Sequence, residues 1–475
     1  MAPFLAGVNE LFASDIHAEI RIQNHYKFKV YSPGEQIIGV AIVTIHHDAA
    51  FDDLDISLTG VAVTHNYVQP DPVQATHPFI KLRAPCDFAA SSSGPNVFRA
   101  GVQYTFPFRF TIPRTLPARS CRHRCIASSL RERHLRLPPT MGFCPGNDGS
   151  PEAARISYGV EFVAYRRYSL LHCPALLFRV TQQVRVLSSC PEEPALDCLQ
   201  AARMYKPSAS KRFWQSVFMG TGGELKVEAS QPRAIVLSPD GTTSSESSVH
   251  LRLAFIPSLA ELPPVKLQSA SGKLTSNTYF HVAPINHAPA LEPPARHELR
   301  PYFYKTRHKL FHQSLERVQW ESNALNDALV QLRNHVSNPD HTAQAGHGRG
   351  RRASLPWAWK HRQEPSVMYT ADVDIPFALP GIKGVVYLPS FDSCLVSRTY
   401  AVNVTVRAGS VLGWVTLSVP IQIVVDGGPQ GTLGTSSEEA SIGLLEAGAE
   451  EDLPPYVAQL ADSGHSTPDV PPSYG

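Results

Sequence analysis

The sequence lacks a hydrophobic run long enough to cross a membrane, and we expect no leader of the kind that secreted proteins carry. Its longest apolar stretch, residues 411–425, is interrupted by polar residues, glycine and proline and falls short of the ~20 residues that a spanning helix needs. Residues 1–8 contain no basic region and no sustained apolar stretch, so we predict no signal peptide. Eight cysteines in 475 residues without such a leader indicate reduced thiols in a cytoplasmic protein.

The motifs that mark common enzyme classes are also missing. We find no phosphate-binding loop, dinucleotide fingerprint or metalloprotease helix, and no converging set of titratable residues. We therefore predict a protein that is not an enzyme, with no catalytic residue and no cofactor. The basic segments 119–136 and 349–362 hold few aromatic residues beyond Trp357 and Trp359, which disfavours binding of nucleic acid.

Charge is unevenly distributed along the chain. The net charge is +2, but residues 427–475 carry eight acidic side chains and no lysine or arginine, which leaves +10 on the rest. A basic body with an acidic tail predicts contact with an anionic membrane or an acidic partner, or association of the tail with the body. An ordinary solvated surface is the alternative that charge alone leaves open.

Alternation of apolar and polar residues is the main pattern, and it predicts β-strands with one buried face. The predicted strands lie at 16–22, 26–30, 37–45, 54–63, 104–112, 156–162, 178–186, 249–255, 402–406 and 415–425. Gly60 marks a slip in phase that predicts a β-bulge, and Pro107 predicts an edge strand. Many short strands separated by turn residues predict an all-β fold of two antiparallel sandwiches.

One segment has helical spacing. Its apolar residues recur every three or four positions, at Phe311, Leu315, Val318, Leu325, Leu329, Leu332 and Val336. This predicts an amphipathic helix over about 308–336, packed on the second sandwich or, alternatively, binding a partner or a membrane. The predicted organisation is an N-terminal sandwich at 1–190, a linker at 191–215, a C-terminal sandwich at 216–426 with a basic loop at 337–364, and a disordered acidic tail at 427–475.

The most specific motif is Pro471-Pro472-Ser473-Tyr474 in the tail. The two prolines favour polyproline II, which has three residues per turn, so Pro471 and Tyr474 project on the same face. WW domains bind this arrangement with an aromatic groove for proline and a slot for tyrosine. Leu453-Pro454-Pro455-Tyr456 offers Leu453 and Tyr456 at the same spacing and is a candidate second site, which would raise avidity.

Several segments, in order, resemble alpha-arrestins of the fungal type. They are Tyr31–Glu35 leading into the strand at 37–44, Ala100–Phe108, Leu137–Thr140, Ile375–Pro380 and Ser397–Tyr400. The resemblance covers residues 15–425 loosely, and the Pro-Pro-x-Tyr tail fits the same family. It implies two arrestin-like β-sandwiches and no catalysis.

The resemblance also implies a function. It implies an adaptor that recruits a WW-domain HECT-type ubiquitin ligase to plasma-membrane transporters or receptors, promoting their ubiquitination and endocytosis. It implies a cytoplasmic protein recruited to plasma membrane and endosomes. An arrestin-type signalling scaffold, as in ambient-pH sensing, and an endosomal sorting subunit are the alternatives. Because the tail has no lysine, the candidate ubiquitin acceptors lie in the body, at Lys226, Lys266 and Lys273.

A second motif, Arg351-Arg352-Ala353-Ser354-Leu355-Pro356, fits a kinase that prefers basic substrates. Phosphorylated Ser354, with Arg351 three residues before it and Pro356 two residues after it, would resemble a 14-3-3 ligand and could switch the adaptor off. An unmodified basic loop is the alternative.

Cysteines and histidines also gather at Cys121, His123 and Cys125, with His134 and Cys144 further along. Their spacing matches no common structural zinc site. We therefore predict free thiols, solvated histidines and no bound metal.

Overall fold

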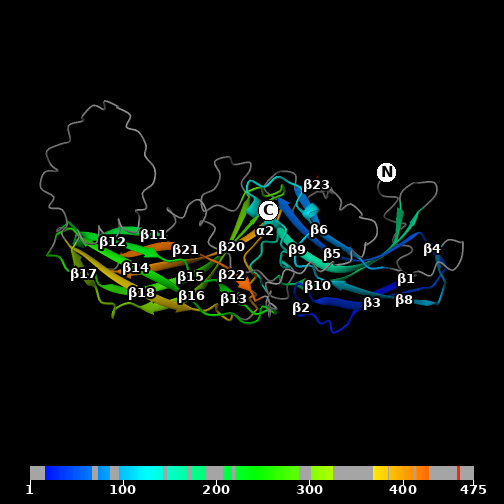
Figure 1. Cartoon of the computed structure of the whole chain (residues 1–475), viewed down its shortest axis with the longest axis horizontal. Coiled ribbons are helices and arrows are strands. Elements are labelled where there is room, and N and C mark those ends of the chain that lie inside the picture. Colours follow the sequence, from blue (N-terminus) through cyan, green and yellow to red (C-terminus); the bar gives the residue numbers. More distant parts are fainter. Residues whose placement is uncertain are drawn as a thin grey trace, which may run out of the picture.

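The fold is described here from a computed structural model. It describes residues 16–66, 73–85, 96–142, 147–167, 174–188, 207–216, 220–259, 261–287, 301–324, 367–382, 384–409, 413–426 and 457–460. These residues form an all-β protein, as the alternating sequence pattern predicts. Figure 1 shows the early strands, blue to cyan, gathered on one side and the later strands, green to orange, on the other. We call residues 16–188 the N-terminal half and residues 207–426 the C-terminal half.

The N-terminal half contains a three-stranded sheet in the order β1-β3-β8 and a six-stranded sheet in the order β2-β10-β9-β5-β6-β23. Their strands are β1 (Ile16–Ile22), β2 (Val30–Tyr31), β3 (Gln36–Ile45), β5 (Asp53–Asn66), β6 (Val73–Arg83), β8 (Gln103–Thr111), β9 (Ala154–Arg167), β10 (Pro174–Val186) and β23 (Val457–Leu460). The short strands β4 (Ala49–Phe51) and β7 (Asn96–Phe98) pair with each other. The aromatic rings of Phe106 on β8 and Phe162 on β9 lie 5.8 Å apart, so the two main sheets pack face to face as a sandwich.

Two local expectations for this half are confirmed. The register between β5 and β6 shifts at Gly60, and a Cβ there would lie 2.6 Å from the side chains of Phe79 and Ile80, so the position suits glycine. Pro107 lies on β8, which ends the order of its sheet, where a missing backbone N–H costs no ladder hydrogen bond. The strand predicted at 26–30 is mostly wrong, since only β2 at its end forms. Tyr26 and Phe28 are each 61% exposed, so burial does not hold them in a sheet.

The C-terminal half contains a sheet in the order β11-β12-β14-β18-β17 and a second in the order β16-β15-β20-β19, with β21 paired to β20. The strands are β11 (Ser208–Ser216), β12 (Gly220–Ala229), β14 (Ser247–Pro257), β15 (Leu267–Phe280), β16 (Tyr302–Ser314), β17 (Glu321–Ala324), β18 (Val367–Phe377), β19 (Phe391–Asp392), β20 (Val396–Ala408) and β21 (Trp414–Ile421). The short strands β13 (Ile235–Leu237) and β22 (Ile423–Val425) pair in parallel. The rings of Phe311 on β16 and Phe377 on β18 lie 6.0 Å apart, and both residues contribute to one apolar core.

The helix predicted over 308–336 is wrong for its described part. Residues up to Ser314 belong to β16, which pairs with β15 in antiparallel register, and β17 follows at Glu321. The register shifts where Gly272 opposes Phe311 and Lys273 opposes Lys309, so Leu310 is an extra residue. The next apolar positions of the predicted helix, Leu315 and Val318, lie in the loop between β16 and β17. Residues 325–336 and the basic loop at 337–364 lie outside the described residues.

Two more segments differ from the expected organisation. The chain forms β11 from Ser208, inside the segment expected to be linker, because β11 pairs along β12. In the tail expected to be disordered, the backbone of β23 pairs with β6, with Ala458 opposite Ala75. The acidic tail therefore has an attachment point on the edge of the N-terminal half.

The one α-helix among the described residues, α2 (Ser128–His134), is short and was not predicted. It begins without a side-chain cap and has three basic residues in its last turn, where they complement the helix dipole. No helix in the described part of the chain is both long and apolar enough to cross a membrane.

Candidate metal centre at the junction of the two halves

Segments of the two halves meet around α2 (Figure 1). Arg133 on α2 donates to the Asp392 carboxylate of β19 at 2.8 Å, and both side chains are mostly buried. The backbone N–H of Ile126 donates to the carbonyl of Asn286 at 2.9 Å. These contacts join residues far apart in sequence, so they fix how the two halves are oriented.

Arg398, at the start of β20, makes a deeply buried contact between the halves. Its side chain is 1% exposed. The guanidinium donates to the carbonyl oxygens of Asp148 at 2.6 Å and Gly149 at 3.0 Å, and to the Ser150 hydroxyl at 3.1 Å. From its own half it also contacts the Thr278 hydroxyl through Nε and one terminal nitrogen, at 3.2 and 2.9 Å. The planar fork of arginine suits this set of acceptors better than a lysine amine would.

Cys121 is held in place by the residue before it. A short 3-10 helix, Ala118–Ser120, ends at Ser120, whose hydroxyl donates to the carbonyl of Phe79 at 2.7 Å. His77 lies 2.9 Å from the carbonyl of the same serine. Cys121 follows in a loop rather than a strand and is 1% exposed. The donors of this segment therefore lie in a loop, where their side chains can converge although their spacing matches no common structural zinc site.

His134 is brought to the same place by α2. Leu130 and His134 are four residues apart and share one helix face, and both are buried. The Nδ1 atom of His134 lies 3.8 Å from the Cys121 sulfur and 3.7 Å from the Cys125 sulfur. Its Nε2 atom is buried and has no hydrogen-bond partner among the described residues. The polar contacts of this ring are thus with sulfur.

Cys394 comes from the C-terminal half. It lies in the turn between β19 and β20, which Ser393 closes through hydrogen bonds with Val396. Its carbonyl accepts from the backbone N–H of Ile285 at 2.8 Å, and its buried sulfur lies 3.8 Å from the carbonyl of Ser120. The turn therefore inserts a thiol between the halves.

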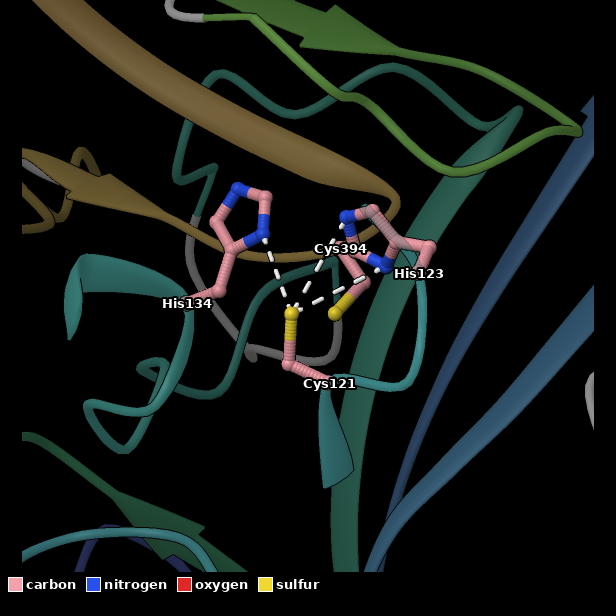
Figure 2. A group of neighbouring side chains, drawn as sticks. All are labelled: Cys121, His123, His134 and Cys394. Atoms are coloured by element: carbon pink, nitrogen blue, oxygen red, sulfur yellow. Dashed lines mark hydrogen bonds between the residues drawn. The ribbon is translucent and has the colours of Figure 1, made fainter. Parts of the chain in front are cut away.

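The four side chains point toward one another in Figure 2. One donor atom from each of Cys121, His123, His134 and Cys394 lies within 4.8 Å of the other three. His123 places Nδ1 3.8 Å from the Cys121 sulfur, while its Nε2 lies 3.1 Å from the carbonyl of Ile285. Cys125 is a fifth donor close by, with its sulfur 3.9 Å from that of Cys121 and 3.6 Å from His123 Nε2.

The thiols influence each other's protonation strongly. A hydrogen bond from Cys394, followed by those from His123 and His134, lowers the pKa of the Cys121 thiol to about 2 against the effect of burial. Burial and the adjacent Cys121 sulfur raise the pKa of Cys125 to about 11. The hydrogen bond to Cys121 and burial raise the pKa of Cys394 as well. The cluster thus stabilises negative charge on one central sulfur.

Thiolate and imidazole donors that converge in this way can bind a metal ion, form a disulfide or remain a polar network. The sequence prediction of no metal rested on Cys121, His123, Cys125, His134 and Cys144. It missed Cys394, which no local spacing connects to the others, and it included Cys144, which lies outside the described residues. The structure therefore assembles a donor set that sequence spacing does not reveal.

The other predicted site residues are distributed as follows. Both tail motifs, Leu453–Tyr456 and Pro471–Tyr474, and the Arg351–Pro356 segment lie outside the described residues, although β23 begins directly after Tyr456. The candidate acceptors Lys226, Lys266 and Lys273 are described, and all three are exposed. Lys226 also pairs with Glu228 at 2.6 Å.

Comparison with known proteins adds one similarity. No curated protein matches the chain. Residues 295–425, which span β16 to β22, match the family model described as the Bul1 C terminus. This part of the chain is thus similar to a family of arrestin-related trafficking adaptors.

Proposed function

We propose that the protein is a non-enzymatic adaptor that recruits a HECT-type ubiquitin ligase to plasma-membrane transporters or receptors and so promotes their ubiquitination and endocytosis. The observation that carries the proposal is the similarity of residues 295–425 to the Bul1 C terminus, a family with a ubiquitin-ligase adaptor role in trafficking. On this proposal the protein acts in the cytoplasm and is recruited to plasma membrane and endosomes.

The tail motifs supply the ligase contact in this proposal. Pro471, Pro472 and Tyr474 would occupy one WW domain, and Leu453, Pro454 and Tyr456 a second. Two motifs on one chain can raise avidity by about 10²–10⁴ when the ligase carries several WW domains. Ten residues separate Leu460, the end of β23, from Pro471. At roughly 5–6 Å × √n, a flexible segment of that length spans about 15–20 Å.

The body would then supply ubiquitin acceptors and cargo contacts. Lys226, Lys266 and Lys273 have exposed side chains on the C-terminal half, so a docked ligase could reach them without unfolding. The basic charge of residues 1–426 would favour contact with an anionic membrane surface. Phosphorylation of Ser354 and capture by a 14-3-3 protein would oppose this activity. Phosphopeptide mapping of protein from cells tests this regulation, and Ser354 found always unmodified would refute it.

The proposal is tested by capture of the full chain on WW domains of a HECT ligase. Tyr474→Ala should weaken binding by the avidity factor, and Tyr456→Ala together with Tyr474→Ala should abolish it. Ser473→Ala is the matched control, because the third motif position projects away from the groove, and it should bind like the wild type. Binding that is indifferent to both tyrosine changes would refute the ligase contact and favour a signalling scaffold or an endosomal sorting subunit.

A further inference from the structure

We propose that Cys121, His123, His134 and Cys394 bind one structural zinc ion that joins the N-terminal half to the C-terminal half. Three ligands come from one short segment of the N-terminal half, and the fourth comes from the turn between β19 and β20 (Figure 2). Two thiolates and two imidazoles are a common ligand set for structural zinc. Both cysteines would bind the ion as thiolates, so any thiol proton still present would be released to solvent on binding.

The distances are close to those of a tetrahedral centre. With zinc–sulfur bonds of about 2.3 Å and zinc–nitrogen bonds of about 2.05 Å, a tetrahedron has sulfur–nitrogen edges of about 3.6 Å. The Cys121 sulfur lies 3.8 Å from Nδ1 of His123 and 3.8 Å from Nδ1 of His134. All four donors fall within 4.8 Å of one another, so shifts of a few tenths of an ångström to about 1 Å, within reach of side-chain rotation, would complete the site.

The backbone orients His123 for this role. Its Nε2 lies 3.1 Å from the carbonyl of Ile285, an acceptor that requires the proton to be on Nε2. The lone pair is then on Nδ1, the atom nearer to Cys121. A carbonyl that binds the far nitrogen of a histidine is the usual outer partner of a metal ligand.

This tautomer also favours Cys394 over Cys125 as the fourth ligand. Cys125 lies 3.6 Å from His123 Nε2, the nitrogen already used by the Ile285 carbonyl. Cys394 is 4% exposed, whereas Cys125 is more exposed. A buried set of four protein ligands is typical of structural rather than catalytic zinc.

The position of the site gives the ion its role. Around it lie the Arg133–Asp392 ion pair and the backbone hydrogen bond from Ile126 to Asn286, both of which cross between the halves. A zinc ion with ligands from both halves would add coordination bonds that require a tetrahedral arrangement of the four donors. It would therefore fix the relative orientation of the two halves, independently of any ligase contact in the tail.

The first test is the zinc content of the purified full chain, measured by elemental analysis and native mass spectrometry. We expect about one zinc per chain in the wild type. Cys121→Ser and Cys394→Ser should each lose it, and Cys394→His, which restores a donor, should recover it. Cys125→Ser is the matched control and should keep it. His250→Ala should also keep it, since His250 contacts Asp372 and Asp374 in a separate exposed cluster.

The second test remains informative if a cysteine variant fails to fold. Cobalt(II) loaded into the wild-type chain should give the intense visible absorption of a tetrahedral thiolate site. Removing metal with a chelator should lower the unfolding temperature of the wild type and speed hydrogen exchange at the amides of Ile126 and Ile285.

Three results would overturn the proposal. Wild-type protein without stoichiometric metal, with Cys121 and Cys125 in a disulfide, would assign the cluster to redox chemistry. Zinc that survives Cys394→Ser but not Cys125→Ser would place the site within residues 121–134 and remove the link between halves. Zinc that survives every single substitution would be adventitious.

Discussion

Replacement of Arg398 by methionine tests whether the junction holds the two halves together. Methionine keeps much of the apolar stem but removes all five guanidinium hydrogen bonds found among the described residues. Three of these reach the segment Asp148–Ser150 of the other half, whose two carbonyl oxygens would lose their donor. A buried acceptor left without a partner costs about 1–3 kcal/mol.

The net loss in free energy of unfolding is smaller than the sum of the contributions of the five hydrogen bonds. Burying an arginine carries a desolvation cost, and methionine recovers it. Two carbonyl oxygens left without a donor, at about 1–3 kcal/mol each, set the loss, and the recovered desolvation of the guanidinium reduces it, so we expect Arg398→Met to reduce the free energy of unfolding by about 2–5 kcal/mol. The stability of Arg398→Lys should lie between that of the wild type and that of Arg398→Met, because a lysine amine cannot reach all the acceptors that the planar guanidinium reaches.

The assay is denaturant unfolding followed by intrinsic fluorescence and circular dichroism, with the slope of each transition compared between variants. Arg407→Met on the same strand is the control, since Arg407 is exposed, and it should change stability by less than about 0.5 kcal/mol. If Arg398→Met changed stability no more than this control, the contacts of Arg398 would contribute nothing to the junction, and our reasoning would be refuted.

Three further predictions concern packing, a buried hydroxyl and the tail. Gly272→Ala should destabilise by about 1–3 kcal/mol, because a Cβ there would lie 2.2 Å from the ring of Phe311. Tyr158→Phe should cost about 1–2 kcal/mol in thermal unfolding, since its buried hydroxyl donates at 2.5 Å to a backbone carbonyl that would lose its partner. Removal of residues 427–475 should speed hydrogen exchange in residues 73–76, which pair with β23.

Each of these has its own control. Gly381→Ala should be nearly neutral, since nothing lies within 4 Å of a Cβ there, and equal effects at both glycines would contradict the packing argument. Tyr26→Phe should leave thermal stability unchanged because Tyr26 is 61% exposed. Amides in β5 are the control and should exchange at the same rate with and without the tail. If exchange in residues 73–76 were also unchanged, the pairing of β23 with β6 would be refuted.

Much of the fold could be predicted because β-strands produce a short-range alternation of apolar and polar residues in the sequence. On β8 and β14 the side chains alternate between core and solvent, so hydrophobic residues recur every second position. Gly60 and Pro107 could be interpreted in the same way, since glycine permits close approaches that a Cβ would block and proline lacks the backbone N–H that a central strand needs. These features need no knowledge of what the strand packs against.

The secondary structure of two segments could not be predicted from the local sequence. The spacing of Phe311 and Leu315 fits a helix, but β15 offers an edge along which residues up to Ser314 pair, and Leu315 lies in the loop that follows. Intrinsic preference is weak compared with a complete set of ladder hydrogen bonds. The helix α2 was missed for the converse reason, because it is stabilised by burial of Leu130 and His134 rather than by its own caps.

The sequence by itself determined the all-β class, the bulge at Gly60, the edge strand at Pro107 and the motifs of the tail, since each depends on residues within a few positions of one another. Only the tertiary structure decided the junction. Cys394 and Arg398 reach it from a turn and a strand that are distant in sequence from Cys121 and Asp148. No periodicity encodes such a meeting, because it depends on how two separately folded sandwiches are placed against each other.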